Sequence, residues 1–567
     1  MITLNNINLS SIDLSGIDLR GIKLGLGGRG GGSSDGFPVL PGDVTRWHFG
    51  GLTNEMMAAM DDPRIEDADH KGRFLSFKNF AWKEGSGISD VYPGFILGDG
   101  VDDFAVTEKE LNFEDTYTVY TAFIPFQDDP IRGMIVCGKD FKKDFYLYYS
   151  YTHLTYYTSG LNDFIPVHIN QFHIIVCKRD KTNAVIKNLI TGESKTFSVS
   201  ELINNPGVYY LWRYYQAASY YAKAAIAGQI IDNGHFTTDE EDENILNWHK
   251  KQYPWLFPDQ AWTVTGKTNE DEDRATIANI TGNGNDLVLS NFGFAEGSGY
   301  GLYQQNYAIW TKVSNRATFT VTSSKIHVTS VTAEEHADFI YTTGQQLKQK
   351  IRITGLPEGV SFVIGRSGVN LKIISQDGIY DVDILDDSSA NPIIGYRINR
   401  IIDSCDITIE QIPEYEGYLV TDGVDDRVVS SSFTLNKDWT IVGNWKMLQP
   451  EANKLSGIVK QNSLFIYNHV DGLNISINDA WNFFKLKDIR SVNAICSDGR
   501  IYLNDWTEII DSKQQTVNES VGTLVIGILG NVYTSLAFKN LGFYNNQNLS
   551  KDDCIKAYNY LQTLKAK

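Results

Sequence analysis

The feature that most constrains the fold of this chain is an internal duplication made of two motifs. The stretch YPGFILGDGVDD at residues 92–103 recurs as YEGYLVTDGVDD at residues 415–426. A second motif, GLTNE at 51–55 followed by LSFKNFAWKEGSG at 75–87, returns as GKTNE at 266–270 and LSNFGFAEGSG at 289–299. Because both motifs recur in the same order, we infer two copies of one structural module.

The two copies differ in the spacing between their motifs. In the first copy the gap is short and runs from Gly87 to Gly98, whereas in the second copy it runs from Gly299 to Thr421. We therefore expect an extra domain of about 110 residues inside the second copy. Several domains also suit a chain of 567 residues, because a single hydrophobic core stops growing at about 250–300 residues.

The residue pattern inside each module predicts strands. The chain is 42% hydrophobic and 12% aromatic, and short runs of alternating apolar and polar residues are bounded by turn residues. Residues 117–123 and 439–445 fall at matching distances after the Asp-Asp pair and indicate half-buried strands. Residues 172–177 and 492–496 indicate a later strand, so each module has enough inward-facing residues for two packed sheets.

The insertion shows the same alternation. Its candidate strands are residues 316–322, 349–354, 360–364 and 405–409. Turn residues separate these runs at the spacing typical of sandwiches, which predicts a smaller β-sandwich.

Each module is also expected to end in a helix. The sequences TDEE at 238–241 and SKDD at 550–553 are N-cap signatures with an acidic residue at the third helical position. Helical spacing then places on one face Ile245, Leu246 and His249 in the first helix and Cys554, Ala557, Tyr558 and Leu561 in the second.

The first 24 residues carry a five-residue repeat of Ile-x-Leu steps. Period five matches neither a helix nor a continuous strand, and so short a stripe needs a partner surface to bury it. The glycine-rich residues 25–36 predict a flexible tether. We favour a docking segment, and a frayed terminus with chance periodicity is the alternative. The docking residues are Ile7, Leu9, Ile12, Leu14, Ile17, Leu19, Ile22 and Leu24.

Charge and cysteine content exclude several classes. A net charge of −19 repels a phosphate backbone, so nucleic acid is not an expected partner. The chain lacks an apolar run of membrane length and a signal-peptide pattern, so we expect neither membrane insertion nor secretion by that route. Five widely spaced cysteines predict buried thiols rather than a disulfide framework or a zinc site.

The repeated stretches FILGDGVDD and YLVTDGVDD resemble the opening strand of concanavalin A-like, laminin G-type jelly-roll modules, and the closing helices fit that pattern. The resemblance implies an all-β fold of tandem jelly-roll β-sandwiches, with a smaller inserted β-sandwich and a short N-terminal docking segment. Residues 266–292 resemble a segment that recurs in proteins of gut Bacteroidales bacteria and their phages, including virion proteins of crAss-like phages. That second resemblance implies a virion fibre or decoration role.

We divide the chain on this basis. The segments are a docking segment at 1–24, a tether at 25–36, a first laminin G-like module with its N-terminal extension at 37–258, a repeated linker motif at 259–301, the inserted β-sandwich at 302–413 and the second module at 414–567.

Catalytic motifs are missing from the sequence. Glycanases on this fold use paired carboxylates, commonly as Glu-x-Asp-x-x-Glu on one strand. The nearest pattern is Asp381-Val382-Asp383, which an exposed strand explains better. The sequence also lacks GxSxG, HExxH and Walker motifs, so we expect no enzymatic activity.

The two acidic turns are the candidate metal site. Their carboxylates are Asp99, Asp102, Asp103, Asp422, Asp425 and Asp426. Such oxygens suit Ca²⁺, which laminin G-type modules sometimes bind at a loop edge; no other cofactor is expected. We favour the alternative, in which the first Asp caps a turn, the Gly takes a positive φ and the Asp pair accepts hydrogen bonds from backbone amides.

Two aromatic stretches are candidates for glycan binding or for a subunit interface. The candidate residues are Tyr146, Tyr148 and Tyr149 in the first stretch and Tyr210, Trp212 and Tyr214 in the second. Exposed rings beside polar groups stack on sugars. However, alternation along a strand turns half of such residues into the core, and subunit interfaces are also rich in Tyr and Trp. We favour core or interface roles.

These inferences together predict a phage virion structural protein, a head or tail fibre component that is synthesised in the host cytoplasm and located in the virion. Its expected partners are other virion proteins, bound through the N-terminus, and further copies of itself in a homo-oligomer. The alternative is a carbohydrate-binding adhesin that recognises host surface glycans.

Overall fold

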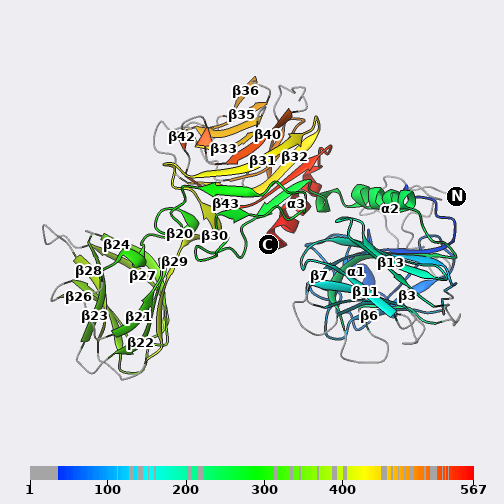
Figure 1. Ribbon diagram of the computed structural model, residues 1–567, viewed down its shortest axis with the longest axis horizontal. Coiled ribbons are helices and arrows are strands. Elements are labelled where there is room, and N and C mark those ends of the chain that lie inside the picture. The colour runs from blue at the N-terminus through cyan, green and yellow to red at the C-terminus, as the bar shows by residue number, and fades with distance from the viewer. Residues whose placement is uncertain are drawn as a thin grey trace, which may run out of the picture.

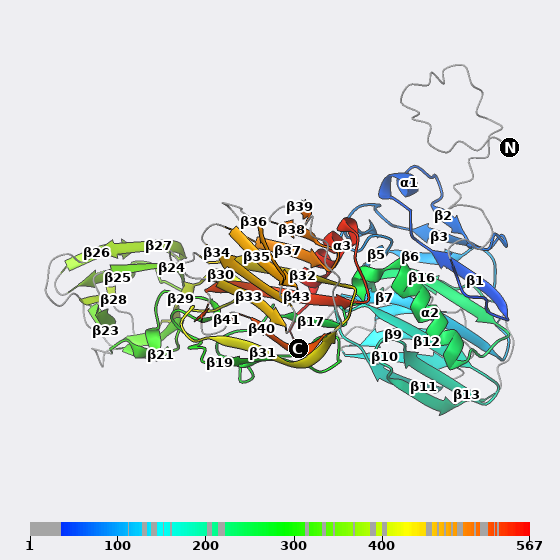
Figure 2. The ribbon, with the colours of Figure 1, turned by 90° about the horizontal axis from the view of Figure 1, so that it is seen from above.

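The computed structural model places antiparallel strands in three β-sandwiches that follow one another along the long axis of the molecule (Figures 1 and 2). The structure describes residues 36–111, 113–126, 133–137, 145–150, 152–158, 161–200, 207–213, 221–311, 317–331, 336–343, 346–366, 369–385, 393–399, 405–448, 456–461, 464–469, 472–477, 480–484, 491–503, 506–510, 520–526, 528–529, 532–533 and 535–566. The predicted docking segment and nearly all of the tether lie outside these residues.

The first sandwich consists of two eight-stranded sheets. The order in one sheet is β14 (Ser194–Ser198), β13 (Asn183–Asn188), β12 (His173–Arg179), β7 (Tyr117–Pro125), β16 (Lys223–Asn233), β5 (Ile96–Asp99) and β4 (Gly87–Ile88), and β1 (Asp43–His48) also pairs with β16. The order in the facing sheet is β11 (Leu161–Pro166), β10 (His153–Thr158), β9 (Phe145–Ser150), β8 (Gly133–Cys137), β15 (Tyr210–Leu211), β6 (Phe104–Thr107), β3 (Phe74–Lys78) and β2 (Arg64–Glu66).

The second sandwich has the same construction. One sheet runs β39 (Thr507–Ile510), β38 (Arg500–Leu503), β37 (Ser491–Cys496), β32 (Trp439–Met447), β43 (Leu536–Asn545), β30 (Glu414–Val420) and β20 (Gly299–Leu302), and β17 (Gln260–Thr263) also pairs with β43. The other runs β36 (Ala480–Phe484), β35 (Gly472–Ile477), β34 (Leu464–His469), β33 (Ser456–Gln461), β40 (Ser520–Ile526), β31 (Arg427–Leu435), β19 (Leu287–Ser290) and β18 (Thr276–Ile277). A two-strand sheet pairs β41 (Ile528–Leu529) with β42 (Val532–Tyr533).

The two sandwiches therefore match strand for strand, and the predicted all-β tandem fold is confirmed. The matching also corrects one boundary. Residues 259–301 do not form a linker, because they contain β17, β18, β19 and most of β20, which belong to the sheets of the second sandwich. Strands of two to four residues leave little alternation to detect, and three of these four strands pair with strands more than 100 residues away in the sequence.

The insertion forms a smaller sandwich between β20 and β30. Its five-stranded sheet runs β21 (Ala317–Val321), β22 (Lys325–Val331), β29 (Ile407–Ile412), β24 (Gln346–Thr354) and β27 (Gly378–Leu385). Its four-stranded sheet runs β23 (His336–Thr343), β28 (Ile393–Asn399), β25 (Ser361–Arg366) and β26 (Val369–Ile374). The strands that flank the insertion pair with each other, with Gly299 opposite Val420 and Leu302 opposite Glu414. The chain therefore leaves and re-enters the second sandwich at neighbouring points.

The helices begin where the N-cap signatures predict. The side chain of Thr238 caps α2 (Asp239–Gln252) in a full capping box with Glu241, and Ser550 caps α3 (Lys551–Thr563) by accepting from the backbone N–H of Asp553. The short elements α1 (Asn54–Ala58), η3 (Pro254–Leu256) and η4 (Tyr307–Ile309) complete the described helices. Strand β7 is buried along its whole length rather than half-buried as predicted, because α2 covers the outer face of its sheet.

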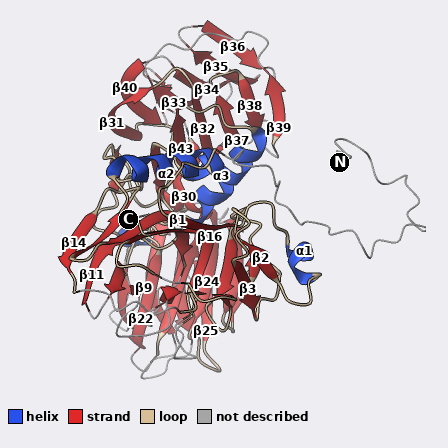
Figure 3. Cartoon of the chain, turned by 90° about the vertical axis from the view of Figure 1, so that its right-hand side faces the viewer, coloured by secondary structure: helices blue, strands red, loops and turns tan. Residues whose placement is uncertain are grey.

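One apolar core joins the first and second sandwiches. It contains Tyr120 and Phe172 from the first sandwich, Trp255 of η3, and Tyr544 and Tyr560 from the second. The hydroxyl of Tyr544 donates to the carbonyl of Trp255 at 3.0 Å, and the rings of Trp255 and Tyr560 lie 6.0 Å apart. Figure 3 shows α2 and α3 between the strands of the two sandwiches. The two modules therefore share buried surface across α2, η3 and α3.

Candidate functional site

The first acidic turn connects β5 to β6 and is built from its own hydrogen bonds. The backbone N–H groups of Val101 and Asp102 donate to Oδ1 of Asp99 at 2.7 and 3.3 Å. The N–H of Asp99 donates to Oδ2 of Asp103 at 3.0 Å, and Gly100 takes a φ of +80°. Side-chain oxygens thus accept from the backbone, as in an Asx-type turn.

The second turn repeats this geometry between β30 and β31. Oδ1 of Asp422 accepts from Val424 and Asp425 at 2.7 and 3.4 Å, and Oδ2 of Asp426 accepts from the N–H of Asp422 at 2.7 Å. Gly423 has a φ of +76°. The structural role that the sequence favoured for these residues accounts for each of these contacts.

The asparagine-containing motif, residues 75–87 and 289–299, holds the acidic turn of its copy in place. The amide of Asn79 donates to the carbonyl of Asp102 at 3.0 Å, and the amide of Asn291 donates to the carbonyl of Asp425 at 2.9 Å. Both asparagines have a φ of +69°, a left-handed conformation that Asn tolerates better than most residues. The two recurring motifs of each copy are therefore in direct contact, which sequence spacing alone did not reveal.

Each turn brings three carboxylates together, and one of the three is buried. The oxygens of Asp99, Asp102 and Asp103 lie within 4.8 Å of one another, as do those of Asp422, Asp425 and Asp426. Burial raises the pKa of Asp103 to about 6, and it raises that of Asp426 to about 7. Oxygen donors of this kind suit Ca²⁺, but burial makes ionisation of one carboxyl in each turn less favourable when no cation is near. Calcium stays a prediction.

The aromatic candidates separate into two groups. Tyr148 and Tyr210 are half-buried and pack around Tyr146, which is 2% exposed, on the outer face of the sheet that contains β9 and β15. Tyr157 of β10 completes the group, and its ring centroid lies 5.5 Å from that of Tyr146. We call these four residues the tyrosine cluster. Alternation along residues 153–158 of β10 was the signal that could have identified Tyr157.

Tyr149 and Trp212 belong to the core, one of the roles that the sequence favoured over glycan binding, so these two residues are not part of a glycan site or a subunit interface. The hydroxyl of Tyr149 donates to the carbonyl of Lys223 at 3.2 Å, and the indole N–H of Trp212 donates to that of Ala224 at 2.9 Å. Trp212 lies just past the end of β15 with a φ of +63°, and this left-handed conformation departs from strand alternation. Tyr214 lies outside the described residues, as do the predicted docking residues 7–24.

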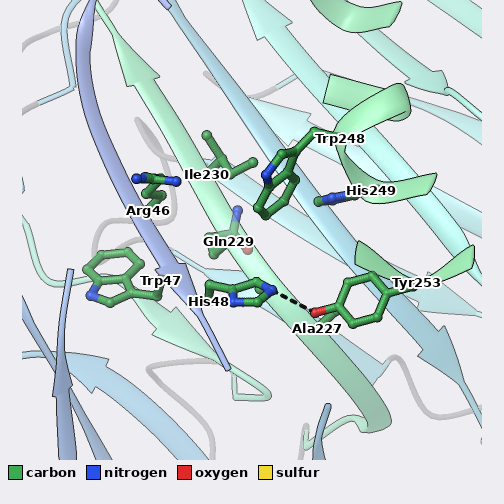
Figure 4. A pocket seen from close by; sticks show the side chains of 10 residues that line it. Arg46, Trp47, His48, Ala227, Gln229, Ile230, Trp248, His249 and Tyr253 are labelled. Atoms are coloured by element: carbon green, nitrogen blue, oxygen red, sulfur yellow. Dashed lines mark hydrogen bonds between the residues drawn. The ribbon is translucent and has the colours of Figure 1, made fainter. Parts of the chain in front are cut away.

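A small cavity lies between β1, β16 and α2 (Figure 4). Its volume of about 10 Å³ is the space of one water molecule, which is too small for an organic substrate. Two of the residues that line this cavity have a buried nitrogen, Gln229 Nε2 and His249 Nδ1, without a hydrogen-bond partner among the described residues. Burial lowers the pKa of His249 to about 3. The neighbouring His48 shares a hydrogen bond of 2.9 Å between its Nε2 and the hydroxyl of Tyr253.

In the described part of the chain, the helices are too short or too polar to cross a lipid bilayer. Asp381 and Asp383, the nearest sequence match to a catalytic pair, both lie exposed on β27, an edge strand of the insertion. Exposed edge strands commonly carry charged residues, which discourage pairing with other chains.

Comparison with known proteins adds distant structural likenesses. No family model matches the chain, and no curated protein matches it. The sialidase of Trypanosoma rangeli in complex with sialic acid is similar at a TM-score of 0.28 and 9% identity, over 38% of this chain and 36% of that one. The binding domain of botulinum neurotoxin serotype G is similar at a TM-score of 0.27 and 9% identity, over 65% of this chain and 98% of that one. The chain spans about a third of the sialidase's length, and both scores are too low to assign a function.

Proposed function

We propose that this chain is a non-catalytic structural component of a phage particle, a head or tail fibre protein that projects its sandwiches outward. The observation that carries the proposal is the apolar core shared by the first two sandwiches. Domains of one chain move relative to each other unless their interface is large and hydrophobic. A shared core therefore favours a rigid pair of modules. Rigidity suits a projecting appendage better than it suits an enzyme whose domains close around a substrate.

The N-terminal sequence supports the same proposal. A short apolar repeat followed by a glycine-rich tether suits attachment to a larger assembly at one end. The resemblance of residues 266–292 to phage virion proteins points in the same direction. Virion location, partners and homo-oligomerisation are parts of this proposal.

Deletion of residues 1–24 tests the attachment. Phage that express only the truncated protein should release particles without it, as measured by mass spectrometry of purified particles. Deletion of residues 27–32 is the matched control, because it shortens the tether and keeps the repeat. Particles that carry the truncated protein at the wild-type level would show that the docking assignment is wrong.

A second candidate function, a carbohydrate-binding adhesin, is favoured by the tyrosine cluster. Three half-buried rings, from Tyr148, Tyr157 and Tyr210, surround a buried fourth on one sheet face. Tyrosine rings offer flat apolar faces and polar hydroxyl groups, the combination that sugar-binding sites use.

The adhesin candidate predicts binding to one class of host surface glycan. The double variant Tyr148→Ala/Tyr157→Ala should weaken the signal on a glycan array at least about 10-fold. Tyr380→Ala is the control, since this half-buried tyrosine lies on the insertion and its hydroxyl donates to the carbonyl of Gln376. Uniform binding of the wild type to every glycan would remove this candidate. Reducing ends released from any bound polysaccharide would instead contradict the non-catalytic assignment.

A further inference from the structure

The terminal helices of the two sandwiches are tied to their sheets by equivalent hydrogen bonds. In the first sandwich the hydroxyl of Thr118 accepts from the N–H of Thr237, which precedes the N-cap of α2, at 3.1 Å. In the second the hydroxyl of Thr440 accepts from the N–H of Leu549, which precedes the N-cap of α3, at 3.0 Å. The two helix starts therefore correspond residue by residue.

In the first sandwich a buried ion pair completes this connection. Lys178 lies opposite Thr118 in the sheet, and its Nζ is 2.6 Å from Oδ2 of Asp242, one turn into α2. The same Nζ donates to the carbonyl of Thr237 at 2.7 Å, and the hydroxyl of Tyr120 donates to Oδ1 of Asp242 at 2.9 Å. Both charged side chains are almost fully buried, with 5% and 2% exposure.

In the second sandwich two cysteines occupy the same two positions. Cys496 lies opposite Thr440 in the sheet, as Lys178 lies opposite Thr118, and Cys554 lies one turn into α3, as Asp242 lies in α2. Both sulfur atoms are 3.9 Å from the carbonyl oxygen of Leu549, the counterpart of the Thr237 carbonyl. The two thiols also contact each other, and both side chains are completely buried.

We propose that Cys496 and Cys554 are a disulfide-forming pair that fastens α3 to β37, in the position where the first sandwich uses an ion pair. Both thiols are free in the structure, so the bond would form by modification of the folded or nearly folded protein. The inference is independent of the proposed function.

The reaction is a two-electron oxidation by a small-molecule disulfide. The thiolate of one cysteine attacks a sulfur of the oxidant, forms a mixed disulfide and expels one thiolate. The thiolate of the other cysteine then attacks that protein sulfur and expels the second thiolate. One S–S bond forms in the protein, one breaks in the oxidant, and the two protons end on the released thiols. The hydrogen bond from Cys554 lowers the pKa of Cys496, which suits Cys496 as the first nucleophile.

The bond would act on the joint between the sandwiches. Tyr560 of α3 packs on Trp255 of η3, and its hydroxyl accepts from the N–H of Phe172 in the first sandwich at 3.4 Å. A covalent link at the start of α3 therefore also stabilises the shared core. Because the closed loop contains about 60 residues, oxidation should raise the melting temperature by roughly 5–15 °C.

Intact mass spectrometry of the full-length protein tests the proposal. The protein is incubated with oxidised or reduced glutathione and then unfolded in N-ethylmaleimide, which labels every free thiol. The oxidised sample should carry two labels fewer than the reduced one, and peptide mapping should join Cys496 to Cys554. Equal labelling of the two samples, or a bond between other cysteines, would overturn the proposal.

Thermal unfolding of variants separates the disulfide from general effects of oxidation. Cys405→Ser, which changes a half-buried cysteine of the insertion, should keep the oxidation-dependent rise in melting temperature. Cys496→Lys/Cys554→Asp, which transfers the ion pair of the first sandwich, should abolish that rise. An oxidation-dependent rise in melting temperature that persists in this double variant would refute the assignment. If the variant fails to fold, the mass measurement on the wild type still tests the proposal.

Discussion

Replacement of Asp426 by asparagine should stabilise the protein at neutral and alkaline pH. The carboxyl is 1% exposed, and burial raises its pKa from 3.8 to about 7. The side-chain amide of the variant Asp426→Asn keeps an oxygen for the N–H of Asp422 and gains a donor toward Oγ of Ser298, which lies 3.5 Å from the native carboxyl. It therefore imitates the protonated acid without its ionisation.

The sign follows from the raised pKa. A carboxyl whose pKa is higher in the folded state favours folding when it is protonated, so its contribution is complete below about pH 4 and is lost as pH rises through about 7. The rise of this pKa from 3.8 to about 7 corresponds to about 4 kcal/mol at most. Since nearby groups relax around the charge, we expect Asp426→Asn to gain about 1–3 kcal/mol at pH 8 and almost nothing at pH 4.

Urea denaturation between pH 4 and pH 8, in the presence of a chelator, measures the difference. Asp425→Asn is the matched control, because this exposed neighbour lies in the same turn and should change stability by less than about 0.5 kcal/mol. A variant that is less stable than the wild type at pH 8 in chelator would refute the reasoning. If millimolar calcium reverses the order of the two proteins, the turn is a calcium site, because the cation binds the ionised wild-type carboxylate.

Three further variants test other parts of the structure. Asp242→Ala leaves the ammonium of Lys178 buried without its partner, so urea denaturation should show a loss of about 3–5 kcal/mol. Gly299→Ala places a methyl group 2.9 Å from the backbone of Phe294 and should lower the melting temperature far more than Gly266→Ala, where φ is also positive but no atom lies within 4 Å. Burial lowers the pKa of His249 to about 3. As pH falls from 6.5 to 3, the free energy of unfolding of the wild type should therefore decrease by up to about 1.4 kcal/mol per pH unit. His249→Gln should remove this part of the acid sensitivity, which denaturation at several pH values measures.

The duplication allowed most of the architecture to be predicted, because two copies of one pattern must fold in the same way. It also predicted the insertion, and the TDEE and SKDD signatures predicted both N-caps. The error at 259–301 has a physical cause. The strands in this segment contain two to four residues, so local alternation is too brief to detect, and three of the four pair with strands more than 100 residues away.

Site residues were harder to predict than strands. Alternation indicated that half of the tyrosines would face the core, but it did not indicate which half, because a shift of one residue exchanges the two faces. Tyr148 and Tyr149 are neighbours, and only the second is in the core. The pairing of Lys178 with Asp242 and of Cys496 with Cys554 depends on where a terminal helix settles on its sheet, which no local pattern encodes.

The paired strands on either side of the insertion have a consequence for how such chains diversify. Because Gly299 lies opposite Val420, the inserted sandwich is attached to the second sandwich in the way that a loop is attached to a β-hairpin. Replacement of the insertion by another domain therefore leaves the register of the sheet unchanged. The first sandwich has the equivalent hairpin without an inserted domain, where Gly87 lies opposite Leu97. That hairpin is therefore a ready place to graft a new domain, whether by recombination during evolution or by an engineer who needs a display site.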